Sequence, residues 1–232
     1  DGAKKDELIA QDPKSAEIIK PILRGRDIKR YKAEFADLWL INSHNGVKGK
    51  FDRIDVEKDY PAIYQHLLQY EERLIKRYDK GEHWTNLRNC AYLEEFEKEI
   101  IVWKAVGRNL TFSLWGKGGF LTAPASFISA ESKDLLLYFL SIFQSKYALY
   151  LILENADTTG AGDVMLNIQS MERLIIPDLS AEEQAPFVSL AEQILHAKEH
   201  KQDSTALEGE IDLMVYELYG LTEEEIKIIE NG

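Results

Sequence analysis

The chain has 232 residues with 45% hydrophobic side chains, one cysteine and a net charge of −12. This apolar content supports a packed core and excludes global disorder. The single cysteine, Cys90, excludes an internal disulfide framework and suits a reducing cytoplasm.

The N-terminal part of the chain mixes strand and helix patterns. The polar segment 1–14 is interpreted as a linker or arm. The apolar run Ile18–Leu23 contains Pro21 and indicates an edge strand, and Leu38–Asn42 indicates a second strand. From Tyr60 to Arg77 the apolar side chains recur with helical spacing, which predicts a helix.

The middle of the chain is predicted to be mainly antiparallel strands. Ile100–Trp103 indicates a strand, and Ser126–Ile128 another. Between them, Leu110–Trp115 and Phe120–Leu121 flank the turn Gly116–Gly119, which is the pattern of a β-hairpin.

A long apolar run follows from Leu135 to Leu153. Its length is close to that of a membrane span, but Gln144 and Lys146 lie at its centre, which favours one or two buried helices. We therefore expect no membrane association. After a loop rich in Thr and Gly at 155–163, the run Arg173–Ile176 predicts a final strand.

The remainder is predicted to be helical. Ser180 and Glu183 have capping-box spacing at the start of one helix. A second helix places apolar residues on one face from Leu207 to Leu218, and Gly220 is suited to cap it.

Together these patterns predict an α+β fold with a mainly antiparallel or mixed sheet, flanking helices and a C-terminal helical hairpin. The predicted organisation is an arm at 1–14, a main domain at 15–178 and an acidic helical unit at 179–232. Because the chain does not begin with Met, we interpret it as an excised piece of a longer protein.

The negative charge is concentrated at the C-terminal end. Residues 178–232 hold 14 acidic residues and 3 lysines, a net charge of −11, so residues 1–177 carry −1. Residues 20–32 contain six Lys or Arg residues and one acidic residue. Residues 103–130 contain three Lys or Arg residues and no acidic residue. DNA binding, which needs basic side chains near phosphates, is therefore allowed for the first 177 residues.

No motif indicates catalysis. Adenine methylation uses a Gly-rich cofactor loop and an Asn/Asp-Pro-Pro-Tyr/Phe loop that grips the flipped base, but all six prolines here are isolated. A nuclease would need clustered carboxylates. His196–His200 matches H-x-x-E-H without a third ligand, and we interpret it as a solvated helix face. We expect no catalytic residue, cofactor site or metal site in this chain.

Six stretches, in order along the chain, resemble the C-terminal specificity domain of TaqI-like enzymes. This family comprises type IIG restriction endonuclease–methyltransferases and related adenine-specific DNA methyltransferases. The stretches are Ile19–Tyr31, His83–Arg88, Phe96–Trp103, Leu140–Lys146, Leu166–Pro177 and Ile211–Thr222.

The resemblance implies a target-recognition domain that positions double-stranded DNA for base flipping by an upstream methyltransferase domain that uses S-adenosylmethionine. The parent would be a bacterial or archaeal adenine-specific DNA methyltransferase, which in type IIG enzymes is also a type II restriction endonuclease. Two alternatives stay open: a DNA-engaging domain of another phage-defence methyltransferase-like protein, or an acidic protein–protein interaction domain.

DNA reading requires Arg or Lys at phosphates and Arg, Lys, Asn or hydroxyl groups at base edges, presented from loops. Arg24, Arg26 and Arg88 are interpreted as structural, and Trp84 and Trp103 as core aromatics. The candidate DNA-binding residues are His44, Asn45, Lys48 and Lys50 in the first loop, Lys104, Arg108 and Asn109 after the Ile100–Trp103 strand, Lys117 in the predicted hairpin turn, and Thr158 and Thr159 in the Gly loop.

Overall fold

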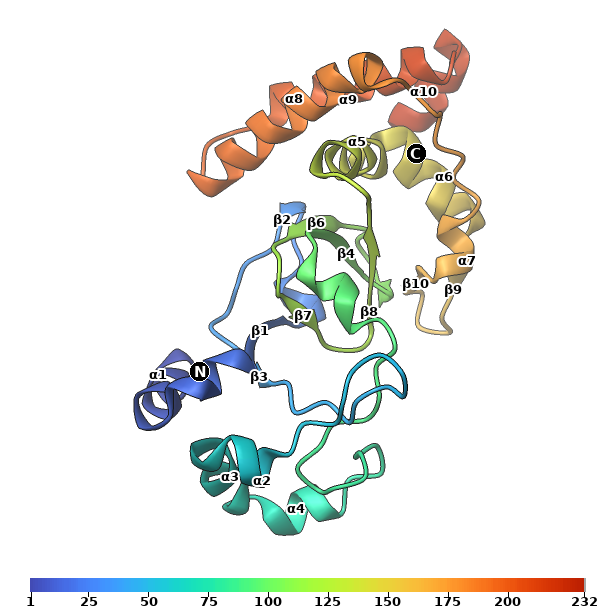
Figure 1. Cartoon of the computed structure of the whole chain (residues 1–232). Coiled ribbons are helices and arrows are strands. Elements are labelled where there is room, and N and C mark those ends of the chain that lie inside the picture. Colours follow the sequence, from blue (N-terminus) through green and yellow to red (C-terminus); the bar gives the residue numbers. More distant parts are fainter. Residues whose placement is uncertain (232) are drawn as a thin grey trace. The chain divides into compact units, whose positions relative to one another are not determined.

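The computed structural model describes residues 1–231 and divides the chain into two compact units, each assembled from distant segments (Figure 1). Helices and three small sheets give the α+β class that the sequence predicts. Unit 1 comprises residues 1–22, 35–97 and 118–120, and unit 2 comprises residues 23–34, 98–117 and those from 121 onward.

Unit 1 is mainly helical. Where the sequence indicated only a linker or arm, α1 forms, because Leu8 packs into a core with Ile18, Val56 and Ile63. The single helix expected over 60–77 is divided in two near Tyr70. The helices of unit 1 are α1 (Gly2–Gln11), η1 (Pro13–Glu17), α2 (Val56–Asp59), α3 (Pro61–Leu68), α4 (Glu71–Ile75) and η3 (Leu93–Glu97).

The first sheet has the order β3-β1-β7, formed by Trp39–Ile41, Ile19–Leu23 and Phe120–Leu121. The prediction that β1 is an edge strand is therefore wrong. Ile22 N donates to Leu38 O (3.0 Å) on the β3 side, so by strand alternation the Pro21 nitrogen points to the other side. On that side the neighbouring strand is β7, which is only two residues long. The sheet therefore tolerates the missing N–H donor of Pro21.

The second sheet lies in unit 2 and has the order β2-β6-β4-β8. Its central strand β4 is buried from Ile100 to Trp103 and pairs antiparallel with β6 and β8, while β2 pairs parallel with β6. The strands predicted at 100–103 and 126–128 are confirmed. The bounds are β2 (Tyr31–Lys32), β4 (Ile100–Lys104), β6 (Phe112–Trp115) and β8 (Ala125–Ser129).

The hairpin predicted across Gly116–Gly119 does not form. Strand β6 already has β2 on one edge and β4 on the other, so no edge is left for Phe120–Leu121. These residues pair with β1 instead, in the first sheet.

The apolar run at 135–153 forms two helices, as one of the sequence interpretations held. Helix α5 (Lys133–Gln144) and helix α6 (Lys146–Asn155) meet at 68°, where the Ser145 hydroxyl accepts from Ala148 N. Among residues 1–231 no single helix is long and apolar enough to cross a membrane, although this bent pair passes that test by length and composition.

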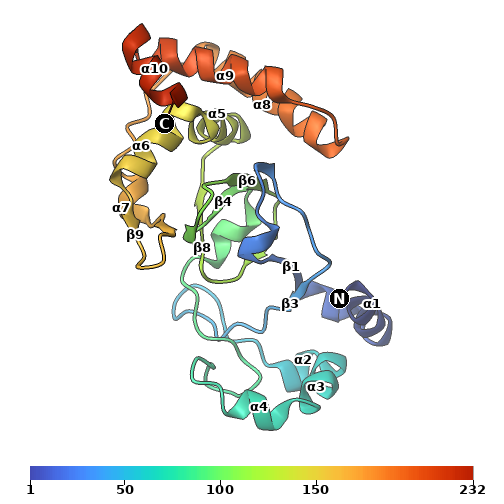
Figure 2. The ribbon, with the colours of Figure 1, turned by 180° about the vertical axis from the view of Figure 1, so that it is seen from behind.

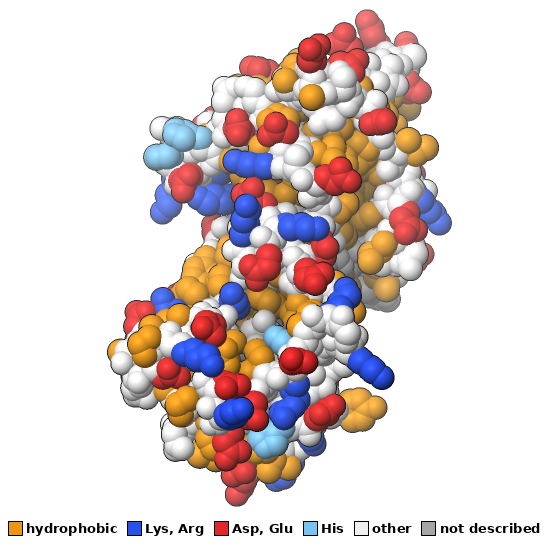
Figure 3. Space-filling view, in the orientation of Figure 1, with side chains coloured by type: hydrophobic (Ala, Val, Ile, Leu, Met, Phe, Trp, Pro, Cys, Tyr) orange, Lys and Arg blue, Asp and Glu red, His pale blue; other side chains and the backbone are white. Residues whose placement is uncertain are grey.

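The last helices of unit 2 are α8 (Ala181–Glu199), α9 (Thr205–Leu218) and α10 (Glu223–Asn231). The Ser180–Glu183 capping box is present, and Gly220 ends α9 with φ of +63°, a conformation that glycine adopts without a steric penalty. Buried side chains of α5, α8 and α9 share one core, and Figure 3 shows acidic side chains gathered over α10. The predicted division at residue 178 stays a prediction.

The strand predicted at 173–176 is absent. After α7 (Ile168–Met171) the chain runs without regular structure, and Ile175 is 80% exposed. Its carbonyl accepts from the Tyr219 hydroxyl and that of Pro177 from the Tyr138 hydroxyl. Side-chain hydroxyl groups, not a neighbouring strand, therefore satisfy these backbone groups.

Candidate nucleic-acid interface

A third sheet in unit 2 brings two of the predicted DNA-binding loops together. It has the order β5-β10-β9, from Val106–Gly107, Val164–Met165 and Asp157–Thr158. Gly107 lies opposite Val164, and Val164 lies opposite Thr158. Because neighbouring strands are antiparallel, the residues after Gly107 and the loop after Thr158 emerge at the same end of the sheet. Figure 2 shows the β9–β10 hairpin beside α7.

The loop between β9 and β10 is tightly closed. Thr159 N donates to Asp163 O (2.7 Å), Asp163 N to the Thr159 hydroxyl (3.0 Å) and Gly162 N to Thr159 O (2.9 Å). Gly162 has φ of +79°, which few other residues adopt readily. Its tip, Gly160–Gly162, is exposed and carries little side-chain bulk, so its backbone can approach a ligand closely.

Arg108 and Asn109 extend from the same end of this sheet. The Arg108 side chain is 79% exposed, and its Nε lies 3.5 Å from Asp163 Oδ1. Such an exposed ion pair contributes little stability, because solvent screens both charges. It orients the guanidinium beside the Gly loop and leaves it able to exchange Asp163 for a phosphate or a base edge.

Lys104 passes between two glycines at the end of β4. A Cβ atom at Gly25 would lie 3.6 Å from Lys104 Cγ, and one at Gly107 would lie 3.8 Å from Lys104 Cδ. The absence of side chains at both positions leaves room for the lysine stem. Arg26 follows Gly25 and is exposed, so a second cation borders this cluster.

The structural interpretation of Arg26 stays a prediction, although the exposed residue follows Gly25, which lies beside Lys104. Arg26 belongs to the basic run 20–32, and the neighbouring Gly25 brings this segment to the Lys104 stem. The loop cluster is defined here as Lys104, Arg108, Asn109, Thr158 and Thr159, with Arg26 at its border.

Lys117 is exposed but separate from the loop cluster. In the pairing of β4 with β6, Trp103 lies opposite Phe112 and Ile100 opposite Trp115. Lys117 therefore follows the end of β6 that is remote from Lys104, about 13 Å away along a four-residue strand.

The predicted loop residues of unit 1 have mixed roles. The Asn45 amide donates to Asn89 Oδ1 (2.8 Å) and accepts from Glu82 N (2.8 Å), so it holds the loop in place. Lys50 Nζ donates to Ala91 O (3.4 Å). Lys48 is exposed on the turn. His44 is partly buried, and its Nδ1 accepts from Gly46 N (3.1 Å).

Several residues that we interpreted as structural are confirmed in that role. Arg24 donates two hydrogen bonds to the Asp27 carboxylate, both at 2.8 Å, and the pKa of that carboxyl falls because these bonds outweigh its burial. Trp103 is 3% exposed, and its indole N–H donates to Leu166 O. Arg88, in contrast, is exposed.

No metal cluster is found among residues 1–231: no group of three His, Cys, Asp or Glu side chains is placed to hold an ion. Residues 116–119 and 160–162, the two Gly-rich loops, each connect one strand to another.

No family model matches the sequence. The chain is 25% identical over 219 residues to the type II methyltransferase M.MjaIV of Methanocaldococcus jannaschii, a match that covers 91% of this chain and 72% of that protein. The sequence is thus similar to that of a methyltransferase from a restriction–modification system.

The fold is shared with part of a much longer enzyme. It superposes with a TM-score of 0.63 and 10% identity on the type IIL restriction–modification enzyme MmeI in complex with DNA, covering 99% of this chain and 33% of that one. The type IIG restriction endonuclease BpuSI matches with a TM-score of 0.49 and 14% identity over 91% of this chain and 28% of its own. The chain therefore spans about a third of MmeI, and the comparisons support a domain of a restriction–modification enzyme.

Proposed function

We propose that this chain is the DNA target-recognition domain of a restriction–modification methyltransferase. The observation that carries the proposal is the β5-β10-β9 sheet. It brings together the residues after Gly107 and the loop after Thr158, which were each predicted from the sequence to contact DNA. The similarity to a type II methyltransferase and the fold shared with an enzyme solved on DNA support it.

The loop cluster suits a groove of duplex DNA. Arg108 is positioned for a phosphate or a guanine edge, and Asn109 for a base edge. The exposed backbone of residues 160–162 can approach the sugar–phosphate chain. Lys104 and Arg26 add positive charge on the neighbouring segments, while the acidic helices α9 and α10 would repel DNA.

The test of this function is salt-sensitive binding to duplex DNA. Fluorescence anisotropy with a pool of labelled duplexes at about 50 and 200 mM salt should show affinity that falls steeply with salt, because bound lysines and arginines release counterions. Binding to no duplex at either salt concentration would leave the acidic protein–protein interaction domain as the better assignment.

Substituting Arg108→Ala should weaken DNA binding by about 5- to 100-fold if the guanidinium contacts a base. If it contacts a phosphate, the loss should be similar for all sequences, and the salt slope should fall by about 1. Lys227→Ala removes the same charge from exposed α10 and is the matched control, whose affinity should not fall. Equal affinities for Arg108→Ala and the unsubstituted chain would remove the loop cluster from the DNA interface.

The proposal assigns methyl transfer to another domain of the parent protein, expected upstream, together with its S-adenosylmethionine. In the parent the product would be methylated adenine, and a fused endonuclease would make it a type IIG enzyme. Calorimetric titration of this chain with S-adenosylmethionine should give no saturable heat. Micromolar binding would contradict this division of labour.

A further inference from the structure

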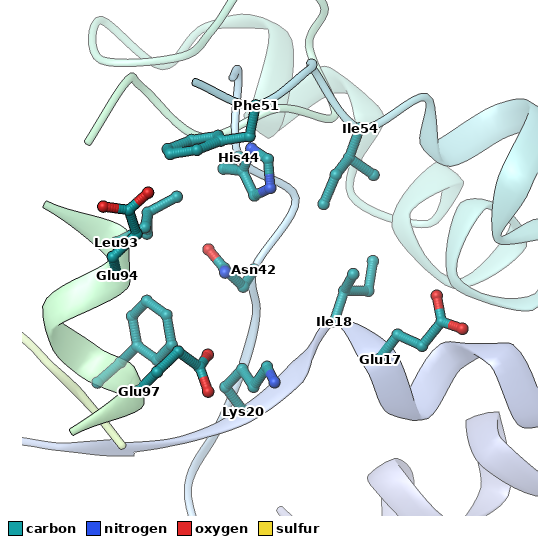
Figure 4. Close-up of a pocket in the computed structure, with 11 residues that line it drawn as sticks. Glu17, Ile18, Lys20, Asn42, His44, Phe51, Ile54, Leu93, Glu94 and Glu97 are labelled. Atoms are coloured by element: carbon teal, nitrogen blue, oxygen red, sulfur yellow. The ribbon is translucent and has the colours of Figure 1, made fainter. Parts of the chain in front are cut away.

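Unit 1 contains a pocket of about 270 Å³ (Figure 4). It is small for a drug-sized ligand and suits one aromatic heterocycle. Apolar side chains, including Phe51, line it together with the amide of Asn42, the imidazole of His44 and the carboxylates of Glu94 and Glu97. All of these residues belong to unit 1, whereas the loop cluster belongs to unit 2.

Asn42 is the feature that points to a ligand. It is 9% exposed, and its side-chain amide points into the pocket (Figure 4). Its backbone N–H donates to Ile18 O (2.7 Å), and among residues 1–231 no hydrogen-bond partner is found for its side-chain amide. This amide faces the pocket and is not among the buried polar atoms that lack a partner, so water can reach it there. A ligand that offers it both an acceptor and a donor would replace that water with direct hydrogen bonds.

The charges of the pocket select the kind of ligand. Three carboxylates and one ammonium group, that of Lys20, line the pocket. Glu94 lies 3.9 Å from Lys50 Nζ and Glu17 accepts from the Tyr60 hydroxyl, so Glu97 is the carboxylate for which the described part of the chain gives no such partner. Burial lowers the pKa of His44, which is therefore neutral at pH 7 and adds no positive charge. An anion such as phosphate is disfavoured in this field, while carboxylates accept hydrogen bonds from an amino group.

The aromatic wall adds a preference for a planar ligand. The His44 ring packs edge-on against Phe51, with centroids 5.1 Å apart and planes at 80°. This contact orients the phenyl ring at the pocket wall (Figure 4). Bases stack on such rings.

We propose that this pocket binds an adenine base. Its N6 amino group and N7 would pair with the Asn42 amide, as asparagine pairs with adenine in DNA complexes, and its ring would stack on Phe51. Glu97 is the acceptor available to the second amino hydrogen. The base could come from a free nucleoside or from an unpaired nucleotide in DNA, and the proposal does not depend on the loop cluster.

The experiment is an NMR titration of the whole ¹⁵N-labelled chain with 2′-deoxyadenosine, 2′-deoxyinosine and deoxyadenosine monophosphate. The Asn42 side-chain amide, identified by its loss in Asn42→Leu, should shift saturably with deoxyadenosine. Deoxyinosine lacks the amino group and should bind about tenfold more weakly, and the monophosphate should also bind more weakly than deoxyadenosine. Equal binding of deoxyadenosine and deoxyinosine, tighter binding of the monophosphate, or no shift would overturn the proposal.

The variants separate recognition from folding. Asn42→Leu should abolish the response of the other pocket resonances, and Asn42→Asp, which keeps a polar group but removes the amide donors, should do the same. Glu97→Gln should weaken binding, whereas Glu72→Gln, an equal charge change on exposed α4, should not.

The source of the base is decided with duplexes that carry one unpaired adenine or one unpaired hypoxanthine. If the chain prefers the adenine duplex and Asn42→Leu removes this preference, the pocket binds an extrahelical base. If deoxyadenosine binds but neither duplex is preferred, the pocket binds a free nucleoside. The nucleoside titrations contain no DNA. If deoxyadenosine fails to bind, the adenine proposal is wrong, but the proposed DNA-binding function is unaffected.

Discussion

Substitution of Arg30→Met should destabilise unit 2 by about 3 kcal/mol, because a partly buried charge network loses its centre. Arg30 Nε donates to Glu208 (2.5 Å), Nη2 to the backbone carbonyl of Gln144 (2.8 Å) and Nη1 to its side-chain Oε1 (3.0 Å). Gln144 is itself fully buried and donates to Phe112 O. The Arg30 side chain therefore joins the segment just before β2 to α5 and α9.

Methionine keeps the apolar stem and removes the guanidinium, so the loss reports the hydrogen bonds. The loss of stability should appear as a lower urea midpoint of unfolding and as faster hydrogen exchange in peptides from α5 and α9. Lys32→Met, two residues along the chain, removes a lysine whose partner Glu199 is largely exposed, and it should leave the midpoint unchanged. Equal midpoints for Arg30→Met and Lys32→Met would show that the network contributes nothing.

The same network makes the stability of unit 2 sensitive to acid. Burial would raise the pKa of Glu208, but hydrogen bonds from Lys198 and Arg30 outweigh it and lower that pKa. A carboxyl whose pKa is lower in the folded state stabilises the fold above its unfolded value, near 4.3. The stability difference between the unsubstituted chain and Glu208→Gln should therefore be constant at neutral pH and shrink below about pH 4. A difference that stays constant to pH 3 would contradict this linkage.

Substitution of Asn86→Ala should destabilise unit 1 by about 2–3 kcal/mol. Asn86 is fully buried, and its Nδ2 donates to Ser43 O (3.2 Å) and Ile54 O (2.9 Å). Its Oδ1 accepts from Arg53 Nη1 (3.0 Å). Alanine would leave the buried Ser43 carbonyl, the partly buried Ile54 carbonyl and the Arg53 guanidinium without these partners.

The measurement is hydrogen exchange read by mass spectrometry across both units. Exchange should accelerate in residues 43–54 and 80–89 for Asn86→Ala, while peptides from α5 and α8 should keep their protection. Asn89→Ala is the control, since it removes an amide that makes one exposed bond, to Asn45. Uniform acceleration in both units would contradict a local role for Asn86.

Both stability predictions concern stretches that carried the family resemblance. Asn86 lies in His83–Arg88, Gln144 in Leu140–Lys146 and Arg30 in Ile19–Tyr31. Asp212, in Ile211–Thr222, accepts from Lys146 N (2.8 Å). The recognisable motifs are thus mainly internal hydrogen-bonding groups that maintain the fold, and the candidate DNA contacts lie between them.

The sequence by itself determined the α+β class, the strands at 38–42, 100–103 and 126–128, and the capped C-terminal helices. These elements are specified by the spacing of nearby apolar residues and by side chains that cap helix ends, and both can be read from neighbouring positions in the sequence. The sequence also determined where the acidic charge lies, whereas the choice of DNA-contacting residues stays a prediction.

Only the tertiary structure decided which strands pair and which loops meet. Pro21 and the Gly116–Gly119 turn gave local signals for an edge strand and a hairpin, but β1 has neighbours on both sides and β6 has no free edge. The meeting of Arg108 with Asp163 depends on the register in which β5 pairs with the β9–β10 hairpin, which lies far from β5 in the sequence. A strand pairs with a distant strand only where the packed core leaves room and a free hydrogen-bonding edge. The local sequence pattern of a strand does not contain this information.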